Sequence, residues 1–408
     1  MRLLAASLAG TLCGALAAHE ARAQPTRGPT SLEATEVGFI PLAGGDSDIG
    51  LGVGQLSTIA HYEKTETEYD WRLETAGFIT FSGDGGVKVP YQDYYVLATF
   101  PNLVPHHLRL DARASFTDES IAEYAGLGNQ SPSPAGDRAS YYEYGRIHPT
   151  VWVRARMPLG RRVSLSLGNE LTQSWIHVDP NSKLAADMHS GSSVVRGLLG
   201  SAAPAAVDLF EYAFLYDSRD DEFATTRGMY HQATLRLSPG GAGDFPYRYG
   251  EADVTARLYA TVFKAPLVVV AARFVGNLEF GDPPFYELAR ANDTWAIGGS
   301  NGVRGVPAGR FSGKIKLFEN LEVRTDVLQF SAFQKPFTLA AVTFFDAGRL
   351  WTDYKPLPQL DGGSLGLKLG VGAGLRLQEQ STFVVRADIA WSPDASPIGA
   401  YFAAGEMF

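Results

Sequence analysis

The chain has 408 residues, of which 45% are hydrophobic, 19% charged and 12% aromatic, and its formal net charge is −9. A charged fraction below the usual ~25%, with 44 glycines and a single cysteine, excludes a disordered chain, a coiled coil and a disulfide scaffold. The acidic charge balance argues against a nucleic-acid-binding surface, so we expect no nucleic-acid partner.

The first 23 residues have the layout of a secretory signal peptide. Arg2 precedes an apolar run over residues 3–18, and Ala23 ends a small-x-small cleavage motif. We therefore expect residues 1–23 to be removed on export. The only cysteine of the chain, Cys13, lies inside this segment, so the mature chain is expected to be stabilised without disulfides.

Beyond this segment, apolar and polar residues alternate with a period of two along almost the whole chain. In residues 252–262, for example, Val254 and Leu258 alternate with Asp253 and Arg257. The same alternation covers residues 69–81, 108–117, 163–172, 268–280, 365–377 and 383–391. These segments exceed the ~5–6 residues of an ordinary globular strand. The pattern therefore predicts long strands with one apolar face and one charged face.

Long strands of this kind favour a membrane barrel over a soluble sandwich. A sandwich has short strands and turns its apolar face inward. No stretch approaches ~18 consecutive apolar residues, so we expect no spanning helix. Only a closed sheet leaves no unpaired backbone groups in hydrocarbon. We therefore expect an all-β protein, a sixteen-stranded antiparallel transmembrane β-barrel surrounded by the lipid of a Gram-negative outer membrane.

Short and long connections alternate along the chain. Short turns are expected at residues 64–66, 102–103, 158–160, 264–265 and 379–380, and longer connections at residues 120–137, 180–204, 282–312 and 352–362. In outer-membrane barrels the short turns are periplasmic and the long connections external. An even strand count also needs a short first strand near residues 36–43. Residues 24–34 then form a short periplasmic tail, and residues 35–408 form one barrel domain.

The stretch from Asp282 to Phe330 and the strand after it carry the most specific motif. It contains Val303-Arg304-Gly305-Val306, then Asn320-Leu321-Glu322-Val323-Arg324, and finally Phe344-Phe345-Asp346-Ala347-Gly348. This arrangement resembles the bacterial surface antigen superfamily of BamA/TamA-like outer-membrane barrels. The resemblance implies that the sixth external loop, which carries Val-Arg-Gly, folds back into the lumen. It also implies that the aromatic-x-Asp-x-Gly element receives the arginine of that loop.

Two other segments are similar to the same kind of protein. Residues 216–228 resemble a turn of this family, and the segment from Tyr401 to Phe408 is similar to the terminal strand signal of outer-membrane barrels. The chain is expected to be a short form without the family's polypeptide-transport-associated domains. The resemblance implies a role in insertion or translocation of a protein or lipid partner, with a periplasmic or outer-membrane protein as partner.

Physical reasoning supports the motif independently of the resemblance. Gly302 and Gly305 flank the loop arginine and allow a tight turn. A guanidinium that leaves bulk water needs carboxylate partners, because its desolvation is costly. The downstream strands offer such carboxylates on their charged faces. We therefore expect a lumenal loop lock made of Val303, Arg304, Gly305, Val306, Glu322, Asp346 and Gly348.

Other motifs are interpreted as structural. Val195-Arg196-Gly197 repeats the tripeptide without the downstream partners and is interpreted as part of an ordinary loop. No His/Cys cluster and no nucleophile–base spacing is recognisable, so we expect no catalytic, metal or cofactor site and no enzyme activity. Two alternatives to an insertion role stay open. They are a passive pore for small solutes and a structural anchor for a separately encoded partner.

Overall fold

The computed structural model describes residues 34–62, 69–82, 87–104, 108–132, 139–221, 224–241, 243–292, 294–332, 335–379, 383–395 and 398–408. The expected signal peptide lies outside these residues, as does the expected tail up to residue 33. Ala34, expected as the end of that tail, is the first residue of the first strand.

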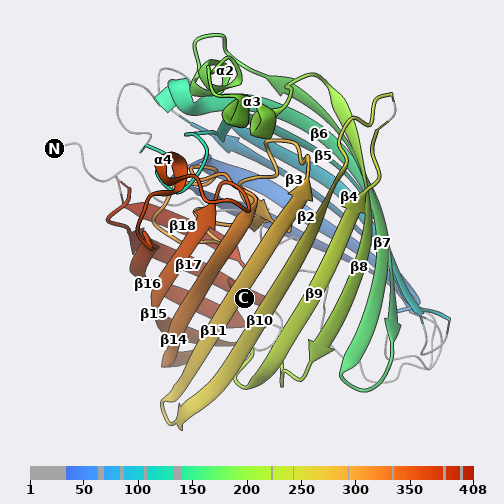
Figure 1. Ribbon diagram of the computed structural model, residues 1–408. Helices are drawn as coiled ribbons and strands as arrows, with labels where there is room; N and C mark the ends of the chain where they lie inside the picture. Colours follow the sequence, from blue (N-terminus) through green and yellow to red (C-terminus); the bar gives the residue numbers. More distant parts are fainter. Residues whose placement is uncertain are drawn as a thin grey trace.

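Sixteen strands close into one antiparallel barrel, in which chain neighbours are also spatial neighbours (Figure 1). The barrel strands are β1 (Ala34–Asp46), β2 (Gly50–Tyr62), β3 (Trp71–Phe81), β4 (Tyr91–Val104), β5 (Leu108–Glu123), β6 (Glu143–Pro158), β7 (Val163–His177), β8 (Ala205–Asp217), β9 (Gly228–Ser238), β10 (Tyr249–Lys264), β11 (Leu267–Gly281), β14 (Ile315–Ala332), β15 (Lys335–Trp351), β16 (Lys368–Glu379), β17 (Phe383–Trp391) and β18 (Gly399–Ala404). β12 (Arg290–Ala291) and β13 (Thr294–Trp295) form a separate small sheet. This architecture confirms the expected fold class.

The period-two pattern decides which side chains face outward. On β10, Val254 and Leu258 are 51% and 49% exposed, whereas Asp253, next to Val254, is buried. On β3 the charged Arg72 and Glu74 are likewise buried in the lumen. An apolar outer surface and a charged lumen match a barrel wall that meets lipid on the outside. Every wall strand is paired on both sides over at least part of its length, so the sheet closes into a barrel, the form in which a sheet can span a membrane.

The two ends of the barrel differ in their connections. The long connections, with the short helices α2 (Lys183–Met188), α3 (Ser193–Leu199) and α4 (Pro358–Asp361) and the 3₁₀ helix η2 (Ala139–Tyr142), gather at one end (Figure 1). There an apolar cluster joins Tyr124, Leu184, Leu199 and Phe285. None of the helices in the described ranges is long and apolar enough to cross a membrane.

One of the expected short turns is wrong, and another cannot be compared with the structure. Asn102 and Leu103 lie inside β4, because pairing with β5 resumes at Val104↔Leu108 after a register irregularity. The turn expected at residues 64–66 lies outside the described residues. The first strand is longer than expected, since β1 spans Ala34–Asp46.

The barrel closes on itself at a short seam. Within the described residues, β1 pairs with β18 only at Gly45↔Phe402 and Asp46↔Tyr401. On its other edge β1 pairs continuously with β2, from Ala34↔Tyr62 to Asp46↔Gly50. β18 is also the shortest wall strand, so it cannot cover the whole edge of β1. The seam is therefore the least extensively paired junction of the described wall.

Candidate functional site

The connection between β11 and β14, residues 282–314, packs against the inside of the wall. Val303, Val306 and Phe311 are fully buried in an apolar cluster with the wall residues Phe318 and Leu350. Wall glycines make room for it. A Cβ at Gly348 would lie 2.5 Å from Ile297 Cδ1, and a Cβ at Gly370 would collide with the carbonyl oxygen of Arg304. The small side chains of the wall therefore permit the close approach of this connection.

Arg304 is fully buried and contacts carboxylates from three wall strands. Its Nε and Nη2 donate to the two carboxylate oxygens of Asp346 at 2.8 and 3.0 Å. Its Nη1 donates to Glu322 Oε1 at 2.8 Å and to Asp388 Oδ2 at 3.1 Å. The guanidinium carbon also lies 3.4 Å from the ring centroid of Phe344. The structure thus brings Arg304, Glu322 and Asp346 together, while their role as a lock stays a prediction.

The positive charge of Arg304 is balanced by carboxylates although its side chain is buried. Burial alone would lower the pKa of Arg304, but the carboxylates of Asp346 and Glu322 raise it above its ordinary value. A buried arginine in this position stays charged, and its fork of donors matches the geometry of a carboxylate. The cluster can therefore hold the connection to β14, β15 and β17 through charge-assisted hydrogen bonds.

Several members of this cluster were not anticipated from the sequence. Asp388 on β17 contacts Arg304, and Arg376 on β16 donates to Asp388 Oδ1 at 2.5 Å and to Glu322 Oε1 at 3.3 Å. Arg324 Nε donates to Glu322 Oε2 at 2.9 Å. All of these residues share the lumenal parity of their strands, which is the sequence signal that could have identified them.

The tip of the connection reaches the seam between β18 and β1. Gly305 has a φ of +89°, which favours glycine, and its backbone N–H donates to Tyr401 Oη on β18 at 2.8 Å. Three residues later, the N–H of Ala308 donates to Asp48 Oδ2, in the turn between β1 and β2, at 3.0 Å. The tip therefore contacts both sides of the seam.

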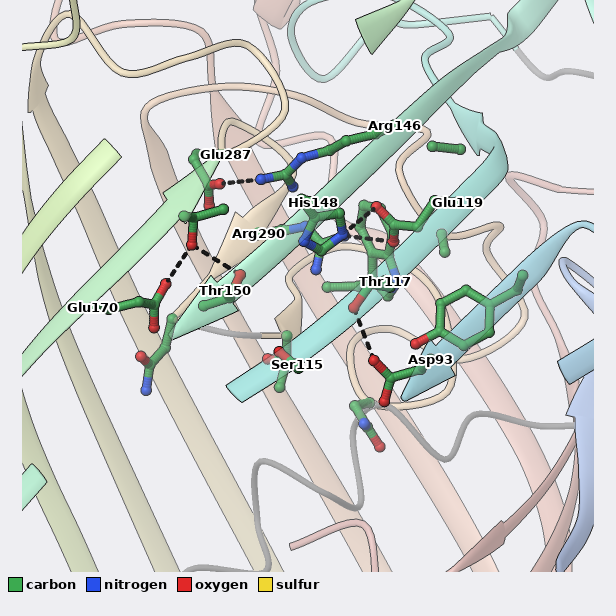
Figure 2. Close-up of a pocket in the computed structure, with 18 of the residues that line it drawn as sticks. Asp93, Ser115, Thr117, Glu119, Arg146, His148, Thr150, Glu170, Glu287 and Arg290 are labelled. Carbon is green, nitrogen blue, oxygen red and sulfur yellow. Dashed lines mark hydrogen bonds and ion pairs between the residues drawn. The ribbon is translucent and has the colours of Figure 1, made fainter. Parts of the chain in front are cut away.

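The other side of the connection contacts the opposite wall, around a cavity of about 230 Å³. Arg290 Nη2 donates to Glu119 Oε1 on β5 at 2.8 Å. Arg146 on β6 lies 3.5 Å from Glu287 Oε1, and its guanidinium carbon is 3.7 Å from the ring centroid of Tyr286. Figure 2 shows Arg146 directed at Glu287 and Glu119 beside His148. The connection thus spans the lumen and is bound at both walls.

Two further predicted segments have the following positions. Tyr401 lies on β18 and is buried, but Phe408 follows the end of that strand and is only 5% exposed inside the lumen. In the turn after β8, Asp220 accepts a hydrogen bond from the hydroxyl of Thr226 at 2.5 Å and from the backbone N–H of Arg227 at 3.1 Å. These hydrogen bonds outweigh burial and hold the pKa of Asp220 below its usual value.

The repeated tripeptide at residues 195–197 is part of α3 rather than of a loop, because Ser192 caps that helix through the backbone N–H of Val195. Arg196 is exposed there. Among the described residues, no group of three or more His, Cys, Asp or Glu side chains is arranged to hold a metal ion.

A closed sixteen-stranded barrel with an apolar outer surface and a charged lumen defines an outer-membrane β-barrel protein. Residues 79–408 match the family model described as the Omp85 superfamily domain. The chain belongs to the Omp85 superfamily, and this family of barrels places it in a Gram-negative outer membrane.

Solved structures show the same fold at low sequence identity. BamA from Haemophilus ducreyi lacking POTRA domains 1-3 has a TM-score of 0.61 and 14% identity, over 91% of this chain and 70% of that chain. CdiB from Escherichia coli has a TM-score of 0.56 and 13% identity, over 90% of this chain and 62% of that chain. The chain thus spans less than two thirds of that CdiB. No curated protein sequence matches the chain.

Proposed function

We propose that this barrel assists the insertion or translocation of a protein or lipid partner at the outer membrane, and that the seam between β1 and β18 opens in the process. The observation that carries the proposal is the two-pair closure at Gly45↔Phe402 and Asp46↔Tyr401. Few hydrogen bonds must break to separate these strands, whereas every other junction of the described wall has a longer ladder.

The exposed edge of β1 supports a polypeptide as the partner. From Val37 to Gly44 the strand has no β18 residue in register within the described residues. Unpaired backbone groups are costly in hydrocarbon, so an incoming strand that pairs with this edge is stabilised there. The relationship to BamA and CdiB agrees with handling of proteins rather than of small solutes.

The connection between β11 and β14 supports control of the seam. Its tip contacts Tyr401 on one side of the seam and Asp48 on the other, and Arg304 binds the tip to the neighbouring wall. Movement of this tip would remove contacts from both sides of the seam together. We therefore assign to the Arg304 cluster the role of a lumenal lock that keeps the seam closed.

A reversible disulfide across the seam tests the proposal. Gly45→Cys with Phe402→Cys joins residues that lie opposite each other. The oxidised variant in vesicles should stop accelerating the folding of an added, unfolded outer-membrane barrel, and reduction should restore the acceleration. Comparing the two redox states of one protein removes any effect of the substitutions themselves.

The matched control is Phe214→Cys with Ala233→Cys, an opposed pair on β8 and β9. Oxidation of that pair should leave the folding of the added barrel unchanged. Acceleration that is insensitive to the seam disulfide would contradict the proposal, and a solute flux equal in both redox states would then favour a passive pore.

A further inference from the structure

A row of residues in register crosses β8, β9, β10 and β11 on the lumenal side of the wall. Asp217 lies opposite Tyr230, and Tyr230 lies opposite Arg257. Arg257 in turn lies opposite Arg273. Leu258, the next residue after Arg257, is exposed on the outer surface, so Arg257 itself faces the lumen. The row begins at the end of β8 that lies away from α2 and α3 (Figure 1), and it places two arginines directly opposite each other.

The two opposed arginines have little opposite charge to share. Like charges directly opposite on neighbouring strands destabilise a sheet. Arg273 Nε and Nη2 donate to Asn320 Oδ1 at 2.9 and 2.7 Å, but the amide is neutral and adds no balancing charge. Asp346, the next residue of the row on β15, already binds Arg304 through both carboxylate oxygens. An additional anion between the two arginines would therefore relieve their repulsion.

Arg257 also has a donor that the protein leaves unused. Its Nε is buried with no hydrogen-bond partner among the described residues. The guanidinium carbons of Arg257 and Arg219 lie 5.0 and 4.8 Å from the ring centroid of Tyr230. Asp217 attracts Arg257, but its two oxygens accept from Arg219 Nε and Nη2 at 3.0 and 2.7 Å. A buried donor without an acceptor is a position where a bound ion supplies the missing partner.

We propose that Arg257, with Arg219 and Arg273, binds the phosphate group of an anionic ligand in the lumen. The three guanidinium groups come from the turn after β8, from β10 and from β11. A tetrahedral phosphate can accept from several directions at once, whereas the two oxygens of a carboxylate lie in one plane. A lipid headgroup and free phosphate share this chemistry. The inference goes beyond the proposed function, because it requires no opening of the seam between β1 and β18.

The site adjoins the connection between β11 and β14. Arg273 Nη2 also donates to the carbonyl of Asn301, and Asn320 Nδ2 donates to the carbonyl of Gly302 at 2.8 Å. Asn301 and Gly302 lie just before Arg304 in the chain. A phosphate that binds Arg273 therefore lies next to the backbone that leads into the Arg304 cluster.

The test uses the full chain in dodecyl maltoside, a detergent without phosphate. Isothermal titration calorimetry measures binding of inorganic phosphate, of dihexanoyl phosphatidic acid, and of dihexanoylglycerol, which has the same acyl chains but no phosphate. Arg257→Met should weaken binding of both phosphate ligands about tenfold, because it removes a charged donor and keeps a similar volume. Arg154→Met is the matched control and should change neither affinity, because this lumenal arginine on β6 is paired with Glu211 at 3.0 Å.

Asp217→Asn should have the opposite effect. It removes the carboxylate that competes for Arg219 and Arg257, so both phosphate ligands should bind about threefold more tightly. A variant that only disturbed the local structure would weaken binding instead. Asp217→Asn therefore keeps the inference testable even if Arg257→Met fails to fold, which heat-modifiable mobility in electrophoresis reports.

Two comparisons of the ligands identify the source of the phosphate. Tighter binding of phosphatidic acid than of inorganic phosphate would assign the site to a lipid headgroup, and equal affinities would assign it to free phosphate. The inference would be overturned by absence of binding, by dihexanoylglycerol binding as tightly as phosphatidic acid, by unchanged binding in Arg257→Met, or by binding in Asp217→Asn that is not tighter. The seam disulfide should leave phosphate binding unchanged, so failure of either proposal does not decide the other.

Discussion

Arg304 and Asp346 are joined by three hydrogen bonds, although 42 residues separate them in the chain. Two come from the guanidinium, at 2.8 and 3.0 Å, and the third comes from the backbone N–H of Arg304 at 3.1 Å. Both side chains are fully buried. Water cannot replace either partner, so loss of one leaves the other buried and uncompensated. Substitution of either residue should therefore weaken the contact of the connection with the wall.

The first prediction concerns this pair. Arg304→Ala and Asp346→Ala should each lower the free energy of unfolding by about 3–5 kcal/mol if the site stays dry, because each leaves a buried charge without its partner. The wall should still form, since its backbone hydrogen bonds do not involve the connection. The measurement is urea unfolding in lipid vesicles, with trypsin cleavage within residues 282–314 reporting release of the connection.

The double variant decides whether the two residues act together. The double variant should lose little more unfolding free energy than either single variant, because the interaction is already absent from each of them. Arg227→Ala, whose side chain is 77% exposed, is the control and should change stability by less than about 0.5 kcal/mol. Strictly additive losses would show that Arg304 and Asp346 do not depend on each other.

The second prediction concerns the faces of β10. Leu258→Arg places a charge on the lipid side and should cost about 2–4 kcal/mol if it lies near the bilayer midplane. Arg257→Leu, at the adjacent lumenal position, removes a cation–π contact with Tyr230 and the attraction between Arg257 and Asp217, and it should cost less folded barrel than Leu258→Arg. Heat-modifiable mobility in electrophoresis reports the folded fraction. An equal loss of folded barrel from both variants would contradict the assigned faces.

The third prediction concerns orientation. Gly160 lies in the short turn after β6, and Gly191 lies in the long connection after β7. Both are exposed, and a Cβ at either position meets nothing within 4 Å. On intact cells, an impermeant thiol reagent should label Gly191→Cys and spare Gly160→Cys, and both should react after permeabilisation. Labelling of Gly160→Cys alone would reverse the orientation.

The fourth prediction concerns the pH dependence of the turn between β1 and β2. Burial, together with the nearby carboxylate of Asp46, raises the pKa of Asp48 to about 8. The folded state therefore holds this proton at pH values where the unfolded state, with a pKa near 3.8, has lost it. Stability should fall as the pH rises from about 4 to about 8 and then level off.

Asp48→Asn should remove this dependence, because the amide is neutral at every pH and its oxygen can still accept from the N–H of Ala308. The measurement is the urea midpoint of both proteins at about pH 5 and about pH 9. A wild-type midpoint that does not fall relative to Asp48→Asn over this range would contradict the assignment.

Much of the wall was predictable from the sequence because side-chain direction in a strand is a local property. The alternation of Val254 and Leu258 with Asp253 and Arg257 identifies the two faces of β10 without knowledge of its neighbours. The same parity placed Glu322 and Asp346 on the lumenal face, and a loop arginine that needs carboxylates made them candidate partners. The turn expected at Asn102 and Leu103 was wrong because β4 extends past a register irregularity and pairs with β5 again at Val104↔Leu108.

Only the tertiary structure decided which lumenal groups meet. Asp388 and Arg376 carry the same parity signal as Glu322, but their contacts with the Arg304 cluster depend on barrel closure and on the path of residues 282–314. The two-pair seam and the entry of Phe408 into the lumen are also set by how the last strand meets the first. The physical reason is that the two features depend on parts of the chain of different extent. Period-two alternation is fixed within each strand by backbone geometry, whereas contacts across the lumen depend on the curvature and closure of all the strands together.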